Sequence, residues 1–366
     1  MEEQKPTESF HFSNETWSWK ELVRNGSVEI DYDRITKACL RRLTGNDPDS
    51  SPYYVVYHAD STVGFANQFR AFAGVFLVAL VTGRRLRIDW DDYYRMMNSP
   101  FQELRFNKSE VSMLHFKYYQ KFSRGYCNDT RYTSFDVDRI FGMRHISFRI
   151  LSDLSCLVIP NLSYQQILRN IGFMIPLTLT PSADNILRGQ IARILLTPNS
   201  ELHYYIAKNL VKLDRKHVIG VQVRTGGDLS VVRESGRFLY QQTIFKIGQI
   251  VKNVIVKQGW NSSECVVFLT ADSGLAFGRI RHDLMDSVKV VSAEGFRAGH
   301  SSAYLSYKHH DEFLKRAILD LVLLSQSDYI LYTYGSSYGT LAGRLSLHSH
   351  YLILRNNVTS LCICLL

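Results

Sequence analysis

The chain has 366 residues, which is long for a single hydrophobic core and predicts two domains. Hydrophobic residues make up 45% and charged residues 21%, a globular composition that excludes a disordered or fibrous protein. The net charge of +9 suits an anionic partner, yet the chain has no block of Lys and Arg, no zinc-type spacing and no aromatic–basic RNA-binding motif. We therefore expect no nucleic acid as partner, whereas an anionic membrane and a phosphorylated small molecule stay open. Solvated Lys and Arg faces explain most of the excess charge.

The first half of the chain opens with a polar, irregular segment and continues with a βαβ unit. Residues 1–50 resemble a stem or an outer flap, with a helix favoured only over Ile35–Leu43. A buried strand at Tyr53–Ala59, a long apolar helix at Phe65–Gly83 and a second strand at Arg84–Trp90 follow. Strand, helix and strand in this order predict a parallel sheet.

The segment between the two halves is less regular. Residues 91–150 are rich in aromatics, and we expect them to decorate the first sheet. The apolar run Cys156–Pro160 is a candidate strand, and residues 163–215 are amphipathic and predicted to be helical. The domain boundary is placed at the end of this helical region, with a first domain at 51–215 and a second at 216–366.

The second half alternates regularly between strands and helices. Strands are predicted at His217–Val223, Cys265–Thr270, Val288–Val291, Asp328–Thr333 and Tyr351–Arg355. Helices are predicted at Leu239–Val256, Gly274–Asp286, Asp311–Gln326 and Tyr338–Ser346. Strands that alternate with helices predict a doubly wound parallel sheet, and the fold class is therefore α/β.

Seven Asn-X-Ser/Thr sequons, more than chance supplies, indicate a glycoprotein of the secretory pathway. The six cysteines permit disulfides, while Cys265, in the apolar run CVVFLT, is predicted to be a buried thiol. The polar start Met1–Phe10 resembles neither a signal peptide nor an anchor, so contact with a membrane would need an anchor that this sequence lacks. The sequons begin at Asn14, Asn25, Asn107, Asn128, Asn161, Asn261 and Asn357.

Polar residues gather where the strands of the second half end. Arg224 follows the first strand and precedes the turn Thr225–Gly227, whose glycines let the backbone approach a ligand. Asp272 follows the second strand, and Ser336 and Ser337 precede the last helix. Parallel strands end at one edge of a sheet, and a helix start offers free N–H groups to an anion. The pattern predicts a diphosphate site; a surface arginine and simple helix capping are the alternatives.

Asp320 is a second unusual position. It lies close to the apolar face of the helix predicted at Asp311–Gln326, and a half-buried carboxylate needs partners. The ring N–H and amino group of guanine together fit one carboxylate. The alternative is a partner from an Arg or Tyr of the fold itself.

Motifs of other enzyme classes are missing from the sequence. It has no G-x-x-x-x-G-K-[ST] phosphate loop, no G-x-S-x-G elbow and no Asp-X-Asp triplet at a strand end. A P-loop kinase therefore lacks its anchor, and a metal-dependent transferase is disfavoured, so we expect no metal. Four histidines at loops or strand ends are interpreted as structural or solvated rather than catalytic: His58, His300, His309 and His310.

Three motifs resemble those of GDP-fucose-dependent fucosyltransferases and occur in the order that this family shows. VGFANQFRAFAGVFLVALVTGRRLRID resembles the turn and helix of the N-terminal domain, and VIGVQVRTGGD resembles the phosphate-binding strand. LDLVLLSQSDYILYTYGSSYGTLAG resembles the acidic helix, strand and serine turn. The combination is most similar to the branch that acts on plant cell-wall xyloglucan, and the motifs cover under a fifth of the chain.

The resemblance implies a GT-B fold, in which two Rossmann-like domains with parallel sheets face each other across a cleft. It implies an inverting, metal-independent transfer of fucose to a hydroxyl of a glycan acceptor. GDP-fucose would be the donor substrate, and no cofactor is expected. The linkage would be of the α1,2 type and the location the Golgi lumen.

The resemblance also assigns residues to the nucleotide side of the cleft. Arg224 would stabilise the departing diphosphate, and Ser336, Ser337 and the N–H groups near Tyr338 would hold phosphate. Asp272, at the neighbouring strand end, belongs to the same set.

Asp320, helped by Gln222, would read guanine. On the acceptor side, Gly64, Asn67 and Gln68 would shape the cleft, although amides at a helix start more often cap it.

The chain departs from the family pattern at several positions. Ala66 replaces a glycine of the first motif, Gln222 stands where several branches have His, and Thr225 replaces a second arginine. No carboxylate is placed by motif as general base. Asp228 is a candidate by its position on the loop, and the weaker candidates are Glu294 and His300. A catalytically silent glycan- or nucleotide-binding protein and a transferase for another nucleotide sugar are therefore the alternatives.

Overall fold

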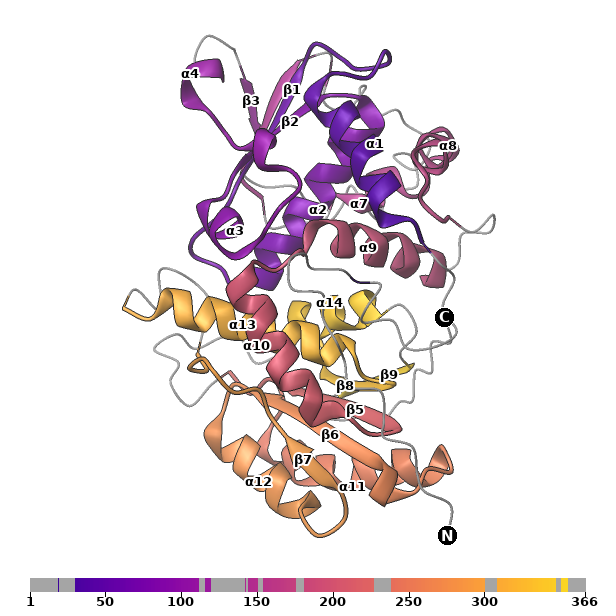
Figure 1. Ribbon diagram of the computed structural model, residues 1–366, viewed down its shortest axis with the longest axis vertical. Coiled ribbons are helices and arrows are strands. Elements are labelled where there is room, and N and C mark those ends of the chain that lie inside the picture. The colour runs from indigo at the N-terminus through magenta and orange to yellow at the C-terminus, as the bar shows by residue number, and fades with distance from the viewer. Residues whose placement is uncertain are drawn as a thin grey trace.

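The fold is built on two parallel sheets, which lie one above the other in Figure 1. Asp228 and His300, two candidates for a general base, fall outside the residues described. This computed structural model describes Trp19 and residues 30–111, 116–119, 142, 144–150, 154–175, 181–226, 238–299, 308–346 and 350–354.

The first sheet has four parallel strands in the order β2-β1-β4-β3. The predicted βαβ unit is confirmed, because α2 (Phe65–Thr82) links β1 to β2 and ends at Gly83. Gly83 has a φ of 64°, the left-handed conformation that favours glycine at the end of a helix. The strands are β1 (Tyr54–His58), β2 (Arg85–Asp89), β3 (Phe116–Tyr119) and β4 (His145–Phe148).

The helix α2 is the centre of the first core. Among the described helices, it alone has the length and apolar composition of a membrane span, and most of that span is buried inside the protein. Phe69, Phe72 and Phe76 are fully buried along it, so its apolar character is explained by packing.

The segment Cys156–Pro160, predicted to be a strand, is wrongly assigned. The structure has a short helix there, α7 (Ser155–Val158). A short apolar run lacks the periodicity that separates a strand from a buried helix, so packing decides. A Cβ on Gly74 of α2 would lie only 2.5 Å from the backbone nitrogen of Leu154, which shows how closely this segment packs on α2.

The N-terminal segment also differs from the expectation of an irregular outer flap. The helix favoured near Ile35–Leu43 is present as α1 (Tyr32–Thr44), and it is capped by the side chain of Asp31. Ile35, Cys39 and Leu43 are buried in the same core as α2, so this helix is part of the first core.

The remaining helices of the first half surround the sheet and lead to the second one. The helical interpretation of residues 163–215 is confirmed for the described part of that range. These elements are α3 (Asp91–Met96), η2 (Gln102–Leu104), α4 (Lys108–Val111), α8 (Leu162–Ile171), α9 (Pro181–Leu195), α10 (Ser200–Leu210) and η4 (Val211–Leu213).

The second sheet has five parallel strands in the order β7-β6-β5-β8-β9, which confirms the predicted doubly wound sheet. The strands are β5 (His217–Val223), β6 (Cys265–Ala271), β7 (Lys289–Val291), β8 (Tyr329–Thr333) and β9 (His350–Leu354). The helices are α11 (Gln241–Lys257), α12 (Gly274–Leu284), α13 (His310–Ser325) and α14 (Ser337–Ser346), with η5 at Ser262–Glu264.

The strand order places a topological switch between β5 and β8. From β5 the chain builds outward through β6 and β7 on one side, and then returns to add β8 and β9 on the other. In open α/β sheets, ligands bind outside the carboxyl ends of the strands at such a switch. The ends of β5 and β8 are therefore the place to look for a site.

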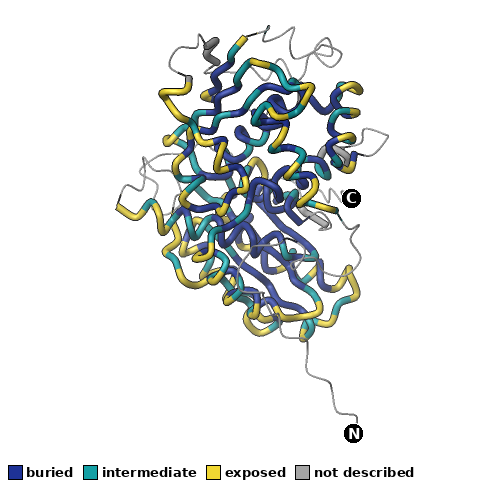
Figure 2. The backbone as a smooth tube through the Cα atoms, turned by 45° about the horizontal axis from the view of Figure 1, so that its top comes forward, coloured by how far each residue is buried: buried dark blue, intermediate teal, exposed yellow. Residues whose placement is uncertain are grey.

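One hydrophobic core joins the two sheets. The helices α11 and α12 cover one face of the second sheet, and Cys265 is buried with them as a free thiol, as predicted. On the other face, α13 and α14 belong to the same buried cluster as α2, with α14 against α2 and α9 and α13 against α10. Figure 2 shows this buried zone passing without interruption from one sheet to the other.

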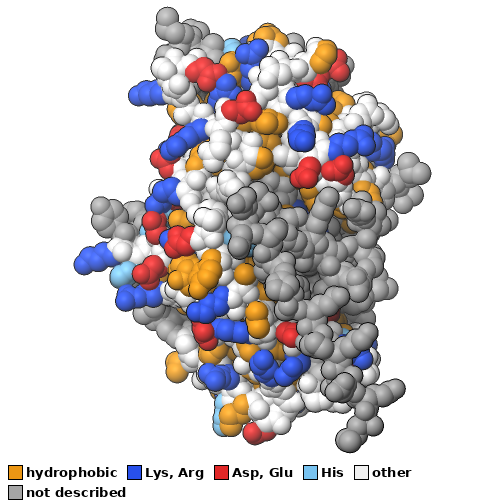
Figure 3. Space-filling view, in the orientation of Figure 1, with side chains coloured by type: hydrophobic (Ala, Val, Ile, Leu, Met, Phe, Trp, Pro, Cys, Tyr) orange, Lys and Arg blue, Asp and Glu red, His pale blue; other side chains and the backbone are white. Residues whose placement is uncertain are grey.

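The charged side chains form no single patch on the visible face. On the described part of the face in Figure 3, Lys and Arg are interspersed with Asp and Glu over both halves of the molecule. The described part of this face therefore shows no basic stripe of the kind that a nucleic acid would need.

Candidate active site

The ends of β5 and β8 are joined by a hydrogen bond at the point where the switch falls. The backbone N–H of Arg224 donates to Oγ1 of Thr333, with 2.9 Å between the two atoms. Thr333 is fully buried, whereas Arg224 is half-buried and its guanidinium carbon lies 5.0 Å from the centre of the Phe238 ring. Thr333 was not predicted as a site residue, although a threonine between a buried strand and a Gly-Ser-Ser turn was a usable signal.

Asp272 holds the turn that follows Arg224. Its carboxylate accepts hydrogen bonds from the backbone N–H groups of Thr225 and Gly226, at 2.8 and 3.0 Å, and from the Thr225 hydroxyl at 2.9 Å. Gly226 has a φ of 97°, which explains why the turn needs a glycine. Asp272 thus acts on the position of the loop; direct contact of Asp272 with a nucleotide stays a prediction.

The start of α14, four residues after Thr333, presents backbone donors. The Oγ of Ser336 accepts from the N–H of Gly339 at 3.2 Å, so Ser336 caps the helix. Among the described residues, the N–H groups of Ser337 and Tyr338 have no hydrogen-bond acceptor. The Tyr338 hydroxyl donates to the carbonyl of Ala317 at 2.6 Å, so only its backbone is available to a phosphate.

Asp320 has two partners inside the fold. Its carboxylate accepts from Oγ1 of Thr270 at 2.8 Å and from Nε of Arg316 at 2.9 Å, and the residue is 5% exposed. Burial raises the pKa of the Asp320 carboxyl above its ordinary value, although the charge of Arg316 acts in the opposite direction. These contacts match the alternative of an internal partner, and a role for Asp320 toward guanine stays a prediction.

Gln222 is also occupied inside the sheet. Its Oε1 accepts from the N–H of Thr333 at 3.4 Å, and the residue is almost fully buried. The side chain therefore helps to hold β5 and β8 in register at the switch point. Its contact with guanine stays a prediction as well.

The three residues that the sequence predicts on the acceptor side lie at the start of α2, and their contact with an acceptor stays a prediction. Gly64 is the N-cap residue and provides no side chain. The Nε2 of Gln68 donates to the carbonyl of Val63 at 2.9 Å, and the Gln68 carbonyl accepts from the Tyr57 hydroxyl at 2.9 Å, so Gln68 fastens the preceding loop. Asn67 is half-buried, with no hydrogen bond to its side chain from the described residues.

A small cavity beside Ser337 is lined by three arginines from three helices. Arg70 comes from α2, Arg188 from α9 and Arg344 from α14, around a volume of about 20 Å³, which is room for one water molecule. Burial, followed by the charges of Arg344 and Arg70, lowers the pKa of Arg188 well below its usual range. The three arginines are far apart in the sequence, so their proximity could not be predicted from the sequence alone.

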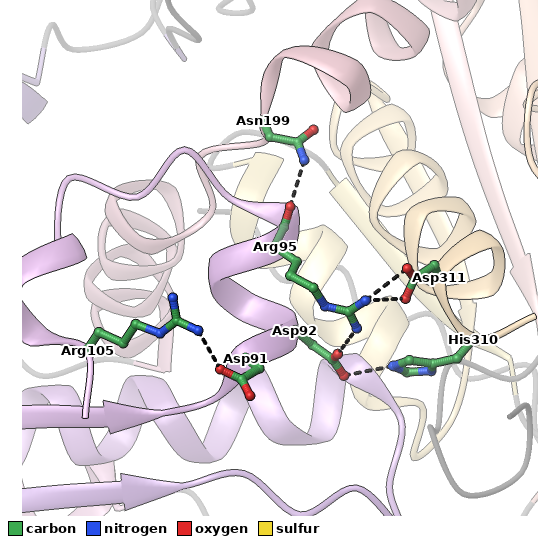
Figure 4. Close-up of polar contacts among 7 residues, drawn as sticks. All are labelled: Asp91, Asp92, Arg95, Arg105, Asn199, His310 and Asp311. Carbon is green, nitrogen blue, oxygen red and sulfur yellow. Dashed lines mark hydrogen bonds and ion pairs between the residues drawn. The ribbon is translucent and has the colours of Figure 1, made fainter. Parts of the chain in front are cut away.

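A polar cluster fastens the two halves to each other near this edge (Figure 4). The Nη1 of Arg95, on α3, donates to both carboxylate oxygens of Asp311, on α13, at 2.7 and 2.9 Å. The Nε2 of His310 lies 2.8 Å from Oδ2 of Asp92, which also pairs with Arg95. Asn199, the N-cap of α10, donates to the carbonyl of Arg95 at 2.8 Å.

This cluster shows how the two sheets are oriented. The helix α3 follows directly after β2 and so lies at the carboxyl-end edge of the first sheet. The helix α13 ends just before the first residue of β8, so its own start lies at the opposite, carboxyl-end edge of the second sheet. Contact between α3 and the start of α13 therefore turns the carboxyl ends of both sheets toward each other. Two Rossmann-like halves in this arrangement define an α/β protein with the GT-B fold.

Comparison with known proteins agrees with this fold. No protein-family model matches the chain, and no curated protein matches its sequence. A structure of an Arabidopsis thaliana FUT1 mutant in complex with GDP is similar, with 14% identity, a TM-score of 0.58, and coverage of 88% of this chain and 74% of that chain. NodZ alpha-1,6-fucosyltransferase co-crystallised with GDP is more distant, with 14% identity, a TM-score of 0.45, and coverage of 83% and 95%.

The described residues offer no constellation for a metal. Within the ranges given above, no group of three or more His, Cys, Asp or Glu side chains is placed to hold a metal ion. The polar groups at the switch point include the guanidinium of Arg224 and backbone N–H groups at the start of α14, which are groups suited to anions.

Proposed function

We propose that the protein is a glycosyltransferase that moves fucose from GDP-fucose to a hydroxyl of a glycan acceptor. One observation supports the proposal: at the topological switch of the second sheet, the N–H of Arg224 is hydrogen-bonded to Thr333, three residues before Ser336, which caps the start of α14. Both groups suit the diphosphate of a nucleotide sugar. The similarity of the fold to FUT1, a structure that holds GDP, supports guanosine diphosphate as the leaving group.

The proposed reaction breaks the bond between C1 of fucose and the β-phosphate oxygen. The electron pair stays with the diphosphate, whose negative charge grows in the transition state. The Arg224 guanidinium and the N–H groups of Ser337 and Tyr338 would stabilise that charge, so the transfer needs no metal ion. Attack by the acceptor hydroxyl on the opposite face of C1 inverts the configuration.

The acceptor and the compartment are part of the same proposal. An α1,2-type linkage and a Golgi-lumen location are supported by the motif resemblance and by the sequons. Asn107 and Asn261 are exposed, as an asparagine that carries an N-linked glycan must be. The side chain of each accepts a hydrogen bond from the N–H two residues further on. Contact with a glycan acceptor is supported by the position of Gly64 and Asn67 at the edge that faces the nucleotide site.

The experiment that tests the function measures GDP binding and fucose transfer by the purified chain in the presence of EDTA. GDP at 100 times its dissociation constant should stabilise the protein by about 2.7 kcal/mol, and GDP-fucose should label glycans on an acceptor array. Arg224→Ala should reduce transfer at least 100-fold, on the order expected for loss of one donor to a developing charge, and weaken GDP binding.

Arg279→Ala is a matched control for this variant. Arg279, on α12, also lies 5.0 Å from the centre of a phenylalanine ring, that of Phe245, but it is remote from the switch point. Its activity should equal that of the wild type. Full activity in Arg224→Ala would contradict the proposed site, and tighter binding of UDP or CDP than of GDP would contradict the donor.

A further inference from the structure

A histidine and an aspartate meet at the carboxyl-end edge of the first sheet. His58 is the last residue of β1 and Asp89 the last of β2, and the two residues are paired in register. Nδ1 of His58 lies 2.6 Å from Oδ2 of Asp89. Since both strands end here, the pair lies at the same type of edge that binds ligands in the second sheet.

This edge faces the nucleotide site of the other half. Asp89 is followed by α3, whose Asp92 and Arg95 contact the start of α13 (Figure 4). On the other side, the chain runs from His58 through a short loop to Gly64 and the start of α2. His58 thus belongs to the acceptor side of the proposed cleft.

The contact with Asp89 determines which ring nitrogen of His58 carries the proton. The hydrogen bond with His58 is the largest effect lowering the pKa of Asp89 below its ordinary value, and the charge of Arg149 acts in the same direction. An ionised carboxylate can only accept, so Nδ1 is the donor, and in the neutral ring the lone pair then lies on Nε2. No described residue donates a hydrogen bond to Nε2, and the His58 side chain is 22% exposed.

We propose that His58 is the general base of the transfer and that Asp89 is its positioning residue. The inference depends on the proposed function and supplies the base that the sequence motifs leave unassigned. Nε2 of His58 takes the proton of the acceptor hydroxyl, while the acceptor oxygen forms the bond to C1 of fucose. The C1–phosphate bond breaks, and GDP leaves with the electron pair. The imidazolium returns its proton to solvent after the products depart.

The test compares His58→Gly and His58→Gln with the wild type, using GDP-fucose and the glycan identified on the array. Glutamine keeps an N–H donor for Asp89 but cannot act as a base. Both variants should lose about 100- to 10,000-fold in kcat, the usual contribution of general-base catalysis, with unchanged affinity for GDP. Added imidazole should restore transfer in His58→Gly in proportion to its concentration.

Two further variants separate chemistry from structure. Asp89→Asn should lower kcat and should not respond to imidazole, because the ring of His58 is still in place. His282→Gly, at an exposed site on α12, should behave like the wild type.

Each outcome of this test is decisive. Wild-type transfer rates in His58→Gln, or loss of transfer in His58→Gly that imidazole does not restore, would overturn the general-base role. Either result leaves the proposed function intact, because the loss of activity in Arg224→Ala tests that function separately. No GDP-fucose turnover by the wild type with any glycan would overturn both.

Discussion

At the scale of single residues, the site relies on groups whose partners are already in place. Asp272 holds the turn after Arg224, and Thr333 holds the backbone of Arg224 itself. Such fixed contacts hold the backbone on both sides of Arg224 in place, which lowers the ordering cost of binding a ligand there. Asp320 differs from these residues. Burial destabilises its charged carboxylate more than the ion pair with Arg316 stabilises it.

The raised pKa of Asp320 predicts a specific pH dependence of stability. Between the ordinary value of 3.8 and the raised folded-state value, the folded protein binds more protons than the unfolded chain. This residue therefore lowers the free energy of unfolding as pH rises through that window. Asp320→Asn removes the titration, so in urea denaturation the variant should gain stability relative to the wild type as the pH rises from 3.8.

Asp283→Asn is the control for the loss of one charge. Arg279 and Asp283 form the same i,i+4 pair as Arg316 and Asp320, but on α12 and with Arg279 exposed. A stability difference between wild type and Asp320→Asn that stays constant across this pH range would contradict the account of a buried, destabilised carboxylate.

At the scale of elements, the position of α14 depends on Gly339, which has no side chain. A Cβ on Gly339 would lie 2.4 Å from Cβ of Tyr332, so only glycine lets the first turn of α14 pack on β8. That packing fixes the helix start, which follows by four residues the Thr333 that holds the backbone of Arg224. Gly343, one turn further along the same helix, has open space where a Cβ would be.

The two glycines should respond differently to alanine. Gly339→Ala should destabilise the protein by about 1–3 kcal/mol and weaken GDP binding, because α14 must move away from β8. Gly343→Ala should be neutral or stabilise the helix by up to about 1 kcal/mol. Thermal melts with and without GDP measure both effects. Equal behaviour of the two variants would show that the packing on β8 does not position α14.

Most elements were predictable because the hydrophobic pattern of each segment agrees with the turn and capping residues at its ends. In the second half, strands of Val and Ile ending in Arg, Asp or Gly residues were placed within a residue or two of their observed ends. The helix α7 was not predictable, because a run of four apolar residues has no readable period and its packing on Gly74 decides its conformation. The buried face of α1 was also missed, although Ile35, Cys39 and Leu43 recur every four residues along the helix.

At the scale of the whole molecule, two sheets share one core and turn their carboxyl ends toward each other. The sequence predicts Arg224 and the serine turn, since each is a local pattern. It does not reveal contacts that depend on the arrangement of the halves. The pair of His58 and Asp89, the cluster of α3 and α13, and the cavity of three arginines all join residues from separate segments.

The central claim is that Arg224 and the start of α14 bind one diphosphate between the two halves of the molecule. A structure determined with GDP bound tests this claim most directly. We predict phosphate oxygens within about 3 Å of the Arg224 guanidinium and of the N–H groups of Ser337 and Tyr338. A nucleotide bound elsewhere, or a diphosphate that contacts only one of these two groups, would contradict the account.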